Sequence, residues 1–258
     1  MRALAVAVVA LVPQAIAGPP EASRADDSPW SAKAGYDYSV GKYGLQNDTT
    51  ISTSSATATY DNDEFGIDVL VPYLWQRGPG RLITIGGQRP TVVSGPAQKS
   101  QGIGDVTVTG TRYLLDEERA GFDLDLGAIV KFGTASASKG LGTGKNDLSL
   151  QAAFGKSIRK VDSTLTVGYT FAGKTSIAPL RDSYYASADA RYTMKAASVG
   201  ATYNYAQAAV AGTEPSRDAS FYVEFKPFQK TRMELYYLKG WSTQSPDRGG
   251  GVSVACDF

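Results

Sequence analysis

The amino-acid sequence predicts an all-β protein, a transmembrane antiparallel up-and-down β-barrel of about 12 strands. Three observations lead to this prediction: segments in which apolar and polar residues alternate, connections whose lengths alternate along the chain, and a last strand that ends at Phe258. A period of two places successive side chains on opposite faces of a strand. In a membrane barrel one of these faces contacts lipid and the other lines the interior.

The N-terminal residues 1–17 are predicted to be a signal peptide that is cleaved on export. A basic start and an apolar run precede a small-x-small triplet at residues 15–17, which is the pattern of secretory signals. Residues 18–29 are rich in Pro, Ala, Ser and Asp, and we expect a flexible periplasmic leader there. The barrel is then expected to occupy residues 30–258.

The alternation is clearest from Phe122 onward, where Leu124 and Leu126 fall on one face and Asp123 and Asp125 on the other. Segments of this kind are each long enough for a tilted transmembrane strand of ~9–11 residues. We predict strands near residues 30–40, 49–60, 64–76, 103–115, 121–132, 147–158, 163–172, 183–193, 196–206, 218–227, 231–241 and 250–258.

Two of these segments fit the pattern less well. The stretch 49–60 is rich in Thr, Ser and Ala, so its apolar face is weak. In the stretch 103–115, Val106 and Val108 share a face with Arg112, which predicts a β-bulge or a change of register.

The connections between the predicted strands alternate in length. After even-numbered strands they are tight, near residues 61–63, 116–120, 159–162, 194–195 and 228–230. After odd-numbered strands they are longer, over residues 41–48, 77–102, 133–146, 173–182, 207–217 and 242–249. Short periplasmic turns and long outer loops are typical of membrane barrels. In a soluble sandwich, loop length is not expected to alternate between odd-numbered and even-numbered strands.

Aromatic residues lie near the ends of the predicted strands, as expected for side chains that prefer the membrane interface. They are Trp30, Tyr73, Trp75, Tyr113, Phe132, Phe154, Phe171, Tyr192, Tyr205, Trp241 and Phe258.

The last strand places Val252, Val254, Cys256 and Phe258 on one face. An amphipathic strand at the very end of the chain must pair with the first strand to close the sheet. A terminal Phe after alternating apolar residues also resembles the recognition strand of bacterial outer-membrane proteins. This resemblance implies that Phe258 is an assembly signal read by the outer-membrane assembly machinery.

The composition excludes several functions. Lys and Arg total 26 against 25 Asp and Glu, a net charge of +1, so the basic excess expected of a nucleic-acid binder is missing. Cys256 is the single cysteine, and the chain has no histidine, the commonest general base and transition-metal ligand. We therefore expect no enzyme activity, no catalytic or metal-binding residues and no cofactor.

Two patterns have a chemical interpretation as well as a structural one. Asp123 and Asp125 share a face and lie roughly 7 Å apart, so they could act as an acid–base pair; a polar lumen wall next to Lys131 is the favoured interpretation. The stretch 140–145 looks like a phosphate-binding loop. It lacks the first Gly and the final Ser or Thr of that motif, and we expect an outer loop there.

The inward face of the barrel is where function is expected. Mixed charges there are compatible with a hydrated pathway whose charges tune selectivity, or with ion-paired networks that fill the lumen. About 12 strands fall between small filled barrels and wide channels, so a narrow pore is favoured over a plugged wall. By the alternation, the lumen-facing candidates are Lys33, Asp37, Asp68, Asp105, Asp123, Asp125, Lys131, Asp147, Asp189, Arg191, Glu224, Lys226 and Glu234.

Short glycine-rich motifs carry a family resemblance. The stretch 102–113 resembles the G-x-G-D-[VL] strand of the outer-membrane proteins of the MetA-pathway of phenol degradation family. The stretches 126–134, 140–147 and 167–170 follow in the order of that family, and the match covers roughly residues 65 to 258. Gly133 departs from it, because the family usually has Pro there. The resemblance implies an outer-membrane barrel that helps hydrophobic or aromatic compounds to cross.

These observations predict an outer-membrane channel for the passive passage of small hydrophobic or aromatic molecules. Solutes would diffuse past the lumen charges and through the long loop at residues 77–102, with outer-membrane lipid around the barrel. The alternative is a non-conducting barrel that serves as a structural anchor or a surface-recognition protein. A lipid-modifying hydrolase is a third hypothesis, disfavoured because the barrel enzymes of this kind use a catalytic histidine.

Overall fold

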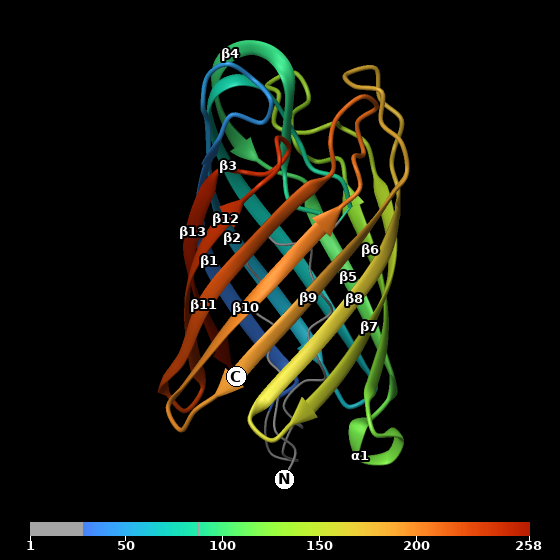
Figure 1. The fold of residues 1–258 in the computed structure, drawn as a ribbon, viewed down its shortest axis with the longest axis vertical. Coiled ribbons are helices and arrows are strands. Elements are labelled where there is room, and N and C mark those ends of the chain that lie inside the picture. Colours follow the sequence, from blue (N-terminus) through green and yellow to red (C-terminus); the bar gives the residue numbers. More distant parts are fainter. Residues whose placement is uncertain (1–27, 87) are drawn as a thin grey trace.

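Twelve antiparallel strands close into a barrel in the computed structural model, which describes residues 28–86 and 88–258 (Figure 1). The predicted fold class is confirmed. The predicted signal peptide, residues 1–17, and most of the predicted leader, residues 18–29, lie outside the described residues and stay predictions.

Except around β3, β4 and β5, the strand bounds lie within two residues of the predicted segments. The weak segment at 49–60 forms a full strand. The elements are β1 (Trp30–Gly41), β2 (Thr49–Asp61), β3 (Phe65–Ile83), β4 (Thr91–Ile103), β5 (Val106–Leu115), α1 (Glu117–Ala120), β6 (Asp123–Phe132), β7 (Asp147–Ile158), β8 (Val161–Phe171), β9 (Ser183–Thr193), β10 (Ala197–Ala206), β11 (Ser216–Phe228), β12 (Thr231–Gly240) and β13 (Arg248–Asp257).

The wall is an up-and-down barrel in which successive strands pair with one another. β1 pairs with β2 and also with β13, so the first and last strands close the sheet, with Ser31 opposite Asp257. The pairing of β2 with β3 completes the ring. β4 pairs with β3 alone and lies outside the ring of twelve.

The predicted strand 103–115 is interrupted. β4 and β5 both run antiparallel to β3, and the two residues between them, Gly104 and Asp105, belong to neither strand. β5 alone continues the wall towards β6, with a register shift between Tyr113 and Leu115. The change of register predicted for this segment is therefore confirmed.

All tight connections lie at one end of the barrel and all long ones at the other (Figure 1). At the short-turn end, one connection forms the four-residue helix α1. The Asp116 carboxylate accepts a hydrogen bond from the backbone N–H of Glu118, and Gly121 ends the helix with a φ of 83°, both of which are common capping arrangements.

Apolar side chains cover the outer face of the wall. Leu150 is 49% exposed and Phe221 is 59% exposed, as expected for side chains that contact lipid. Tyr113, predicted to belong to an interfacial girdle, faces inward instead and donates a hydrogen bond to Asp61, because by alternation it continues the inward row of buried threonines on β5. No helix within the described residues has the length and hydrophobicity needed to cross a membrane.

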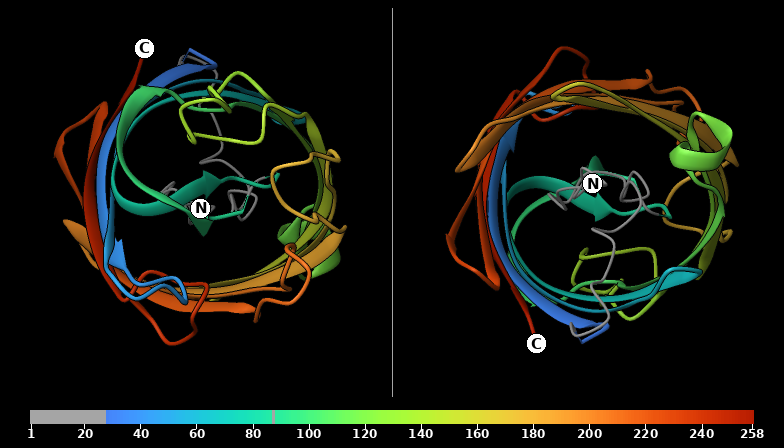
Figure 2. Two further views of the ribbon diagram at one scale, coloured as in Figure 1. Left: turned by 90° about the horizontal axis from the view of Figure 1, so that it is seen from above. Right: turned by 90° about the horizontal axis from the view of Figure 1, so that it is seen from below.

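The prediction of a long loop at residues 77–102 was wrong. These residues form the extended upper part of β3 and the strand β4, joined as a hairpin that bends inward and crosses the barrel interior (Figure 2). Gly78, Gly80, Pro79 and Pro90 interrupt the alternation in the sequence. For that reason the stretch has the composition of a loop although its backbone pairs as strands.

Candidate functional site

The β3–β4 hairpin is attached to the far wall of the barrel through its tip, which we define as Ile83, Ile85, Gly86, Gln88 and Arg89. The backbone N–H of Gly86 donates to Asp147 Oδ2 at 3.0 Å, at the start of β7. The Gln88 amide donates to hydroxyls on β8 and β9. The Arg89 guanidinium lies 3.2 Å from Asp218 of β11. The tip therefore spans the interior from β3 to the opposite wall.

Two glycines allow this path. Gly80 has a φ of 93° and Gly86 a φ of 52°, in the left-handed region that favours glycine. A Cβ atom on Gly86 would collide with the hydroxyl of Ser149. Because glycine has no side chain, Gly80 and Gly86 can adopt the bend, and Gly86 can approach the wall closely.

A buried charge cluster lies beside the tip. Lys131 Nζ lies 3.0 Å from Asp105 Oδ2 and 3.3 Å from Asp147 Oδ2, and the three side chains are 0%, 0% and 1% exposed. The ammonium group also donates to the carbonyl of Lys145 at 2.8 Å. The Asp105 carboxylate accepts from the backbone N–H of Ala135. The cluster is thus fully hydrogen-bonded, as a buried ion pair requires.

This cluster brings together three separate glycine-rich motifs. Asp105 comes from the motif at 102–113, Lys131 from that at 126–134, and Asp147 from that at 140–147. The sequence places all three on the inward face but gives no pairing between them. Lys131 does not pair with Asp123 or Asp125, which had been expected to form the wall next to it.

Two further basic side chains of the wall, Arg191 and Arg232, have acidic partners of their own. Arg191 lies 3.0 Å from Asp162, and Arg232 lies 2.7 Å from Asp257. Sequence reasoning missed Asp162, Asp218, Asp257 and the bases Arg89 and Arg232. Asp162, Asp218, Asp257 and Arg232 lie at or just beyond the ends of strands that had been recognised, where alternation gives little guidance. Arg89 lies in the hairpin that had been predicted to be a loop.

A second group of acids is held by hydroxyl groups. Tyr222 on β11 crosses Gly200 on β10 and donates to Asp189 Oδ1 on β9 at 3.1 Å, and Thr202 also donates to Asp189, at 2.6 Å. A Cβ atom on Gly200 would collide with the Tyr222 ring. The missing side chain makes room for the ring.

This arrangement of tyrosine, glycine and acceptor on three successive strands recurs three times. Each time an atom of the tyrosine side chain, in the ring or its hydroxyl group, lies within 3 Å of where a Cβ atom on the glycine would be. The sets are Tyr236, Gly251 and Asp37; Tyr185, Gly168 and Gln151; and Tyr113, Gly66 and Asp61.

The remaining candidates lie in three different surroundings. Asp68 accepts a hydrogen bond from Thr59 at 2.6 Å. Asp123 accepts from the backbone N–H of Glu117 at 2.8 Å, so it supports the α1 turn. Glu224 and Glu234 lie opposite each other on β11 and β12, and Lys33 is within electrostatic range of both. Two further candidates differ in exposure: Asp125 is buried, and Lys226 is exposed near the short-turn end.

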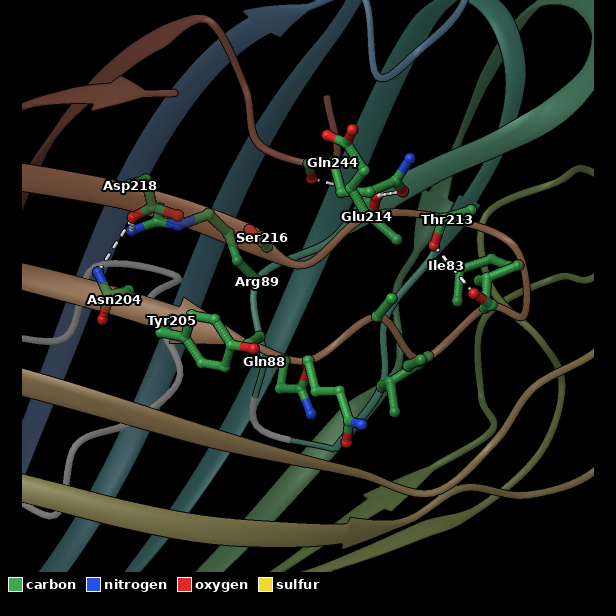
Figure 3. A pocket seen from close by; sticks show the side chains of 17 residues that line it. Ile83, Gln88, Arg89, Asn204, Tyr205, Thr213, Glu214, Ser216, Asp218 and Gln244 are labelled. Carbon is green, nitrogen blue, oxygen red and sulfur yellow. Dashed lines mark hydrogen bonds and ion pairs between the residues drawn. The ribbon is translucent and has the colours of Figure 1, made fainter. Parts of the chain in front are cut away.

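A pocket lies between the hairpin tip and the upper ends of β10 and β11 (Figure 3). Ile83, Ile85 and Val210 give it an apolar side, and Arg89 and Asn204 give it a polar side. Asn204 is buried, its amide nitrogen donates to Asp218 at 3.0 Å, and its Oδ1 has no hydrogen-bond partner. The pocket is therefore lined by an aliphatic surface on one side and by a guanidinium and an amide side chain on the other.

Two apolar clusters pack around the hairpin at the long-loop end. The first includes Tyr43 from the β1–β2 connection, together with Leu82 and Leu141. Burial raises the pKa of Tyr43 to about 12, so its phenol stays neutral. The second cluster includes Ile83 and Ile85 of the tip and Val210.

Within residues 28–86 and 88–258, no group of three or more His, Cys, Asp or Glu side chains is arranged to hold a metal ion.

Solved structures of similar fold are outer-membrane barrels. The COG4313 outer membrane channel from Pseudomonas putida F1 is 14% identical, with a TM-score of 0.69 over 93% of this chain and 99% of that one. The KdgM porin is 13% identical, with a TM-score of 0.54 over 88% and 99%. The P. putida toluene transporter TodX is 13% identical, with a TM-score of 0.52 over 91% and 91%. At these identities the likeness concerns the fold.

The closed twelve-stranded wall, its apolar outer face and these relatives in fold define a β-barrel of the outer-membrane class. No curated protein is significantly similar to this chain in sequence. The family model described as "Putative MetA-pathway of phenol degradation" matches residues 30–258, and the chain belongs to that family. The resemblance found in the glycine-rich motifs is thereby confirmed.

Proposed function

We propose that the protein is a porin-like channel of the Gram-negative outer membrane through which small molecules diffuse passively, without a cofactor, an energy source or a catalytic step. The observation that carries this proposal is the composition of the inner wall. Thr, Ser, Gln and Asp side chains line it, and such a surface fits water and solutes better than a packed core. The inward hairpin narrows the lumen from within.

The cargo we propose is small and hydrophobic or aromatic. The pocket beside the hairpin tip combines an aliphatic side, formed by Ile83, Ile85 and Val210, with a few polar groups, as small-molecule sites commonly do. TodX, which shares the fold, is a toluene transporter, and the family description names phenol degradation. Both support an aromatic cargo.

The route to the membrane belongs to the same proposal. Residues 1–17 direct export, the assembly machinery reads the C-terminal strand at Phe258, and lipid surrounds the exposed apolar wall. We place the short-turn end of the barrel, with α1, on the periplasmic side of the membrane, and the long-loop end, with the hairpin, on the outer side.

Planar-bilayer recording of the purified protein tests the proposal. We expect discrete conductance steps. We also expect larger steps from a variant in which residues 84–90 are replaced by Asn-Gly, a pair that closes two-residue hairpin turns, because the contacts of the tip with the far wall are then removed. Heat-modifiable gel migration of both proteins shows that each is folded.

A silent barrel would support the second candidate, a non-conducting anchor or surface-recognition protein. The observation that favours this candidate is the filling of the upper lumen by the hairpin tip, the Lys131 cluster and the two apolar clusters. In that case both the native protein and the 84–90 variant stay closed.

A further inference from the structure

We infer that the lumen prefers cations: charged solutes bearing an amine pass more readily than solutes of the same size bearing a carboxylate. This inference rests on the proposed channel function and adds the charge class of the solute. It follows from how the described charges of the inner wall are partnered, in three steps.

First, basic side chains of the wall are neutralised by acids of their own. Arg191 pairs with Asp162 at 3.0 Å, and Arg89 with Asp218 at 3.2 Å. Arg232 pairs with Asp257 at 2.7 Å, and Lys131 is shared by Asp105 and Asp147. These pairs leave no net positive charge on the parts of the wall where they lie.

Second, several other carboxylates are held by neutral groups. Asp37 accepts from Tyr236 at 2.5 Å, Asp68 from Thr59 at 2.6 Å and Asp189 from Thr202 at 2.6 Å. A hydroxyl donor fixes the orientation of a carboxylate without adding positive charge. The negative charge of these three groups is therefore uncompensated by their hydrogen-bond partners.

Third, two further carboxylates have oxygens that no donor reaches. Asp125 is 2% exposed and Glu234 is 4% exposed, and Asp125 Oδ1 and Glu234 Oε2 lack a hydrogen-bond partner. Glu234 faces Glu224 across the β11–β12 pair. Lys33 is the base within electrostatic range of Glu234. It is also within range of Glu224 and Asp37, which have other bases near them: Arg191, Arg232 and Lys226 for Glu224, and Arg89 for Asp37. The charge of such a carboxylate attracts a passing cation through the protein interior, where the effective dielectric constant is lower than in water.

These acids are distributed around the wall. Asp37 lies on β1, Asp68 on β3, Asp125 on β6, Asp189 on β9 and Glu234 on β12. Rings of acidic side chains select cations in other channels. A surface of one sign in a narrow cleft concentrates counter-ions.

The test is the reversal potential across a planar bilayer that separates two KCl concentrations. We expect K⁺ to permeate roughly threefold or more over Cl⁻ at ~0.1 M salt, and this preference to decrease towards ~1 M, where the Debye length falls to about 3 Å. Asp68→Asn with Asp189→Asn should shift the reversal potential towards zero, since an amide oxygen still accepts the hydrogen bonds from Thr59 and Thr202. Asp63→Asn, on an exposed turn, is the matched control and should leave it unchanged.

Liposome swelling gives a second readout, with glucosamine expected to enter faster than glucuronate. A zero or anion-selective reversal potential in a conducting protein overturns this inference and leaves the channel function intact. A protein that never conducts overturns the proposed channel function, and the charge preference with it.

Discussion

Tyr236 on β12 donates a hydrogen bond of 2.5 Å to Asp37 on β1, across the strand β13 that lies between them. The ring passes over Gly251, where a Cβ atom would come within 2.5 Å of the ring and 2.6 Å of Asp37 Oδ1. One side chain thus connects three strands at the seam where the ends of the barrel meet. Backbone pairing alone connects only adjacent strands.

Tyr236→Phe should destabilise the barrel by about 1–3 kcal/mol, because the half-buried carboxylate of Asp37 loses a donor. The measurement is the temperature at which the folded band disappears in heat-modifiable gel electrophoresis. Tyr237→Phe, on the outer face and 52% exposed, is the control. Equal behaviour of the two variants would contradict the role of the hydrogen bond.

Gly251→Val should reduce the yield of closed barrel, since the added side chain occupies the place of the Tyr236 ring. Gly110→Val is the matched control, because no heavy atom lies within 4 Å of a Cβ at Gly110. The folded fraction in membranes, measured by resistance to protease, compares the two. A normal yield for Gly251→Val would show that the seam tolerates a side chain there.

Lys131→Met should destabilise the protein by about 3–5 kcal/mol, because two buried carboxylates then lack their counter-charge. Lys174→Met removes the exposed pair of Lys174 with Asp182 and should cost about 0–1 kcal/mol. Urea unfolding of the purified protein in detergent, followed by tryptophan fluorescence, measures both. A small effect of Lys131→Met would mean that water compensates the two acids.

Gly86→Val should displace the hairpin tip and enlarge the conductance steps, since the new side chain collides with Ser149 and Thr170. Gly212→Val is the control: Gly212 also has a positive φ, 84°, but no neighbouring atom within 4 Å. Because both glycines have a positive φ, a difference between the two variants reports the collision of the new side chain at position 86 with the wall and not backbone strain. Unchanged conductance for Gly86→Val would show that the tip does not narrow the path.

Leu150→Arg should lower stability by about 2–4 kcal/mol if Leu150 faces the membrane midplane. Ser138→Arg, in the exposed β6–β7 connection, should have no such effect. Folding titrations in lipid vesicles give the free energies of unfolding. A tolerated Leu150→Arg would argue against lipid contact on this face.

The wall of the barrel was predictable because its determinants are local. Alternation in Asp123–Phe132 sets which side chains face inward without reference to any other strand, and the lengths of the connections show which ends of the strands lie together. The break between β4 and β5 was foreseen only as an irregularity near Val106 and Arg112. The inward hairpin was missed, because glycine and proline obscure the alternation that its strands otherwise follow.

The lumen was predictable in its composition and not in its pairing. The sequence placed Asp105, Lys131 and Asp147 on the inward face, yet it did not show that Lys131 on β6 lies opposite Asp147 at the start of β7 and also contacts Asp105 in the break before β5. The tyrosines that cross glycines are also recognisable only in space, since Tyr236 and Asp37 are separated by almost the whole chain.

The fold class, the order of the strands and the faces they present could be read from the amino-acid sequence, because these follow from a repeat of two residues and from the lengths of turns. Three features became visible only in the folded barrel: a hairpin crosses the lumen, several bases of the wall have acidic partners, and several acids are hydrogen-bonded to hydroxyl groups. Those features depend on contacts between residues that are far apart in the sequence and come together only when the barrel closes.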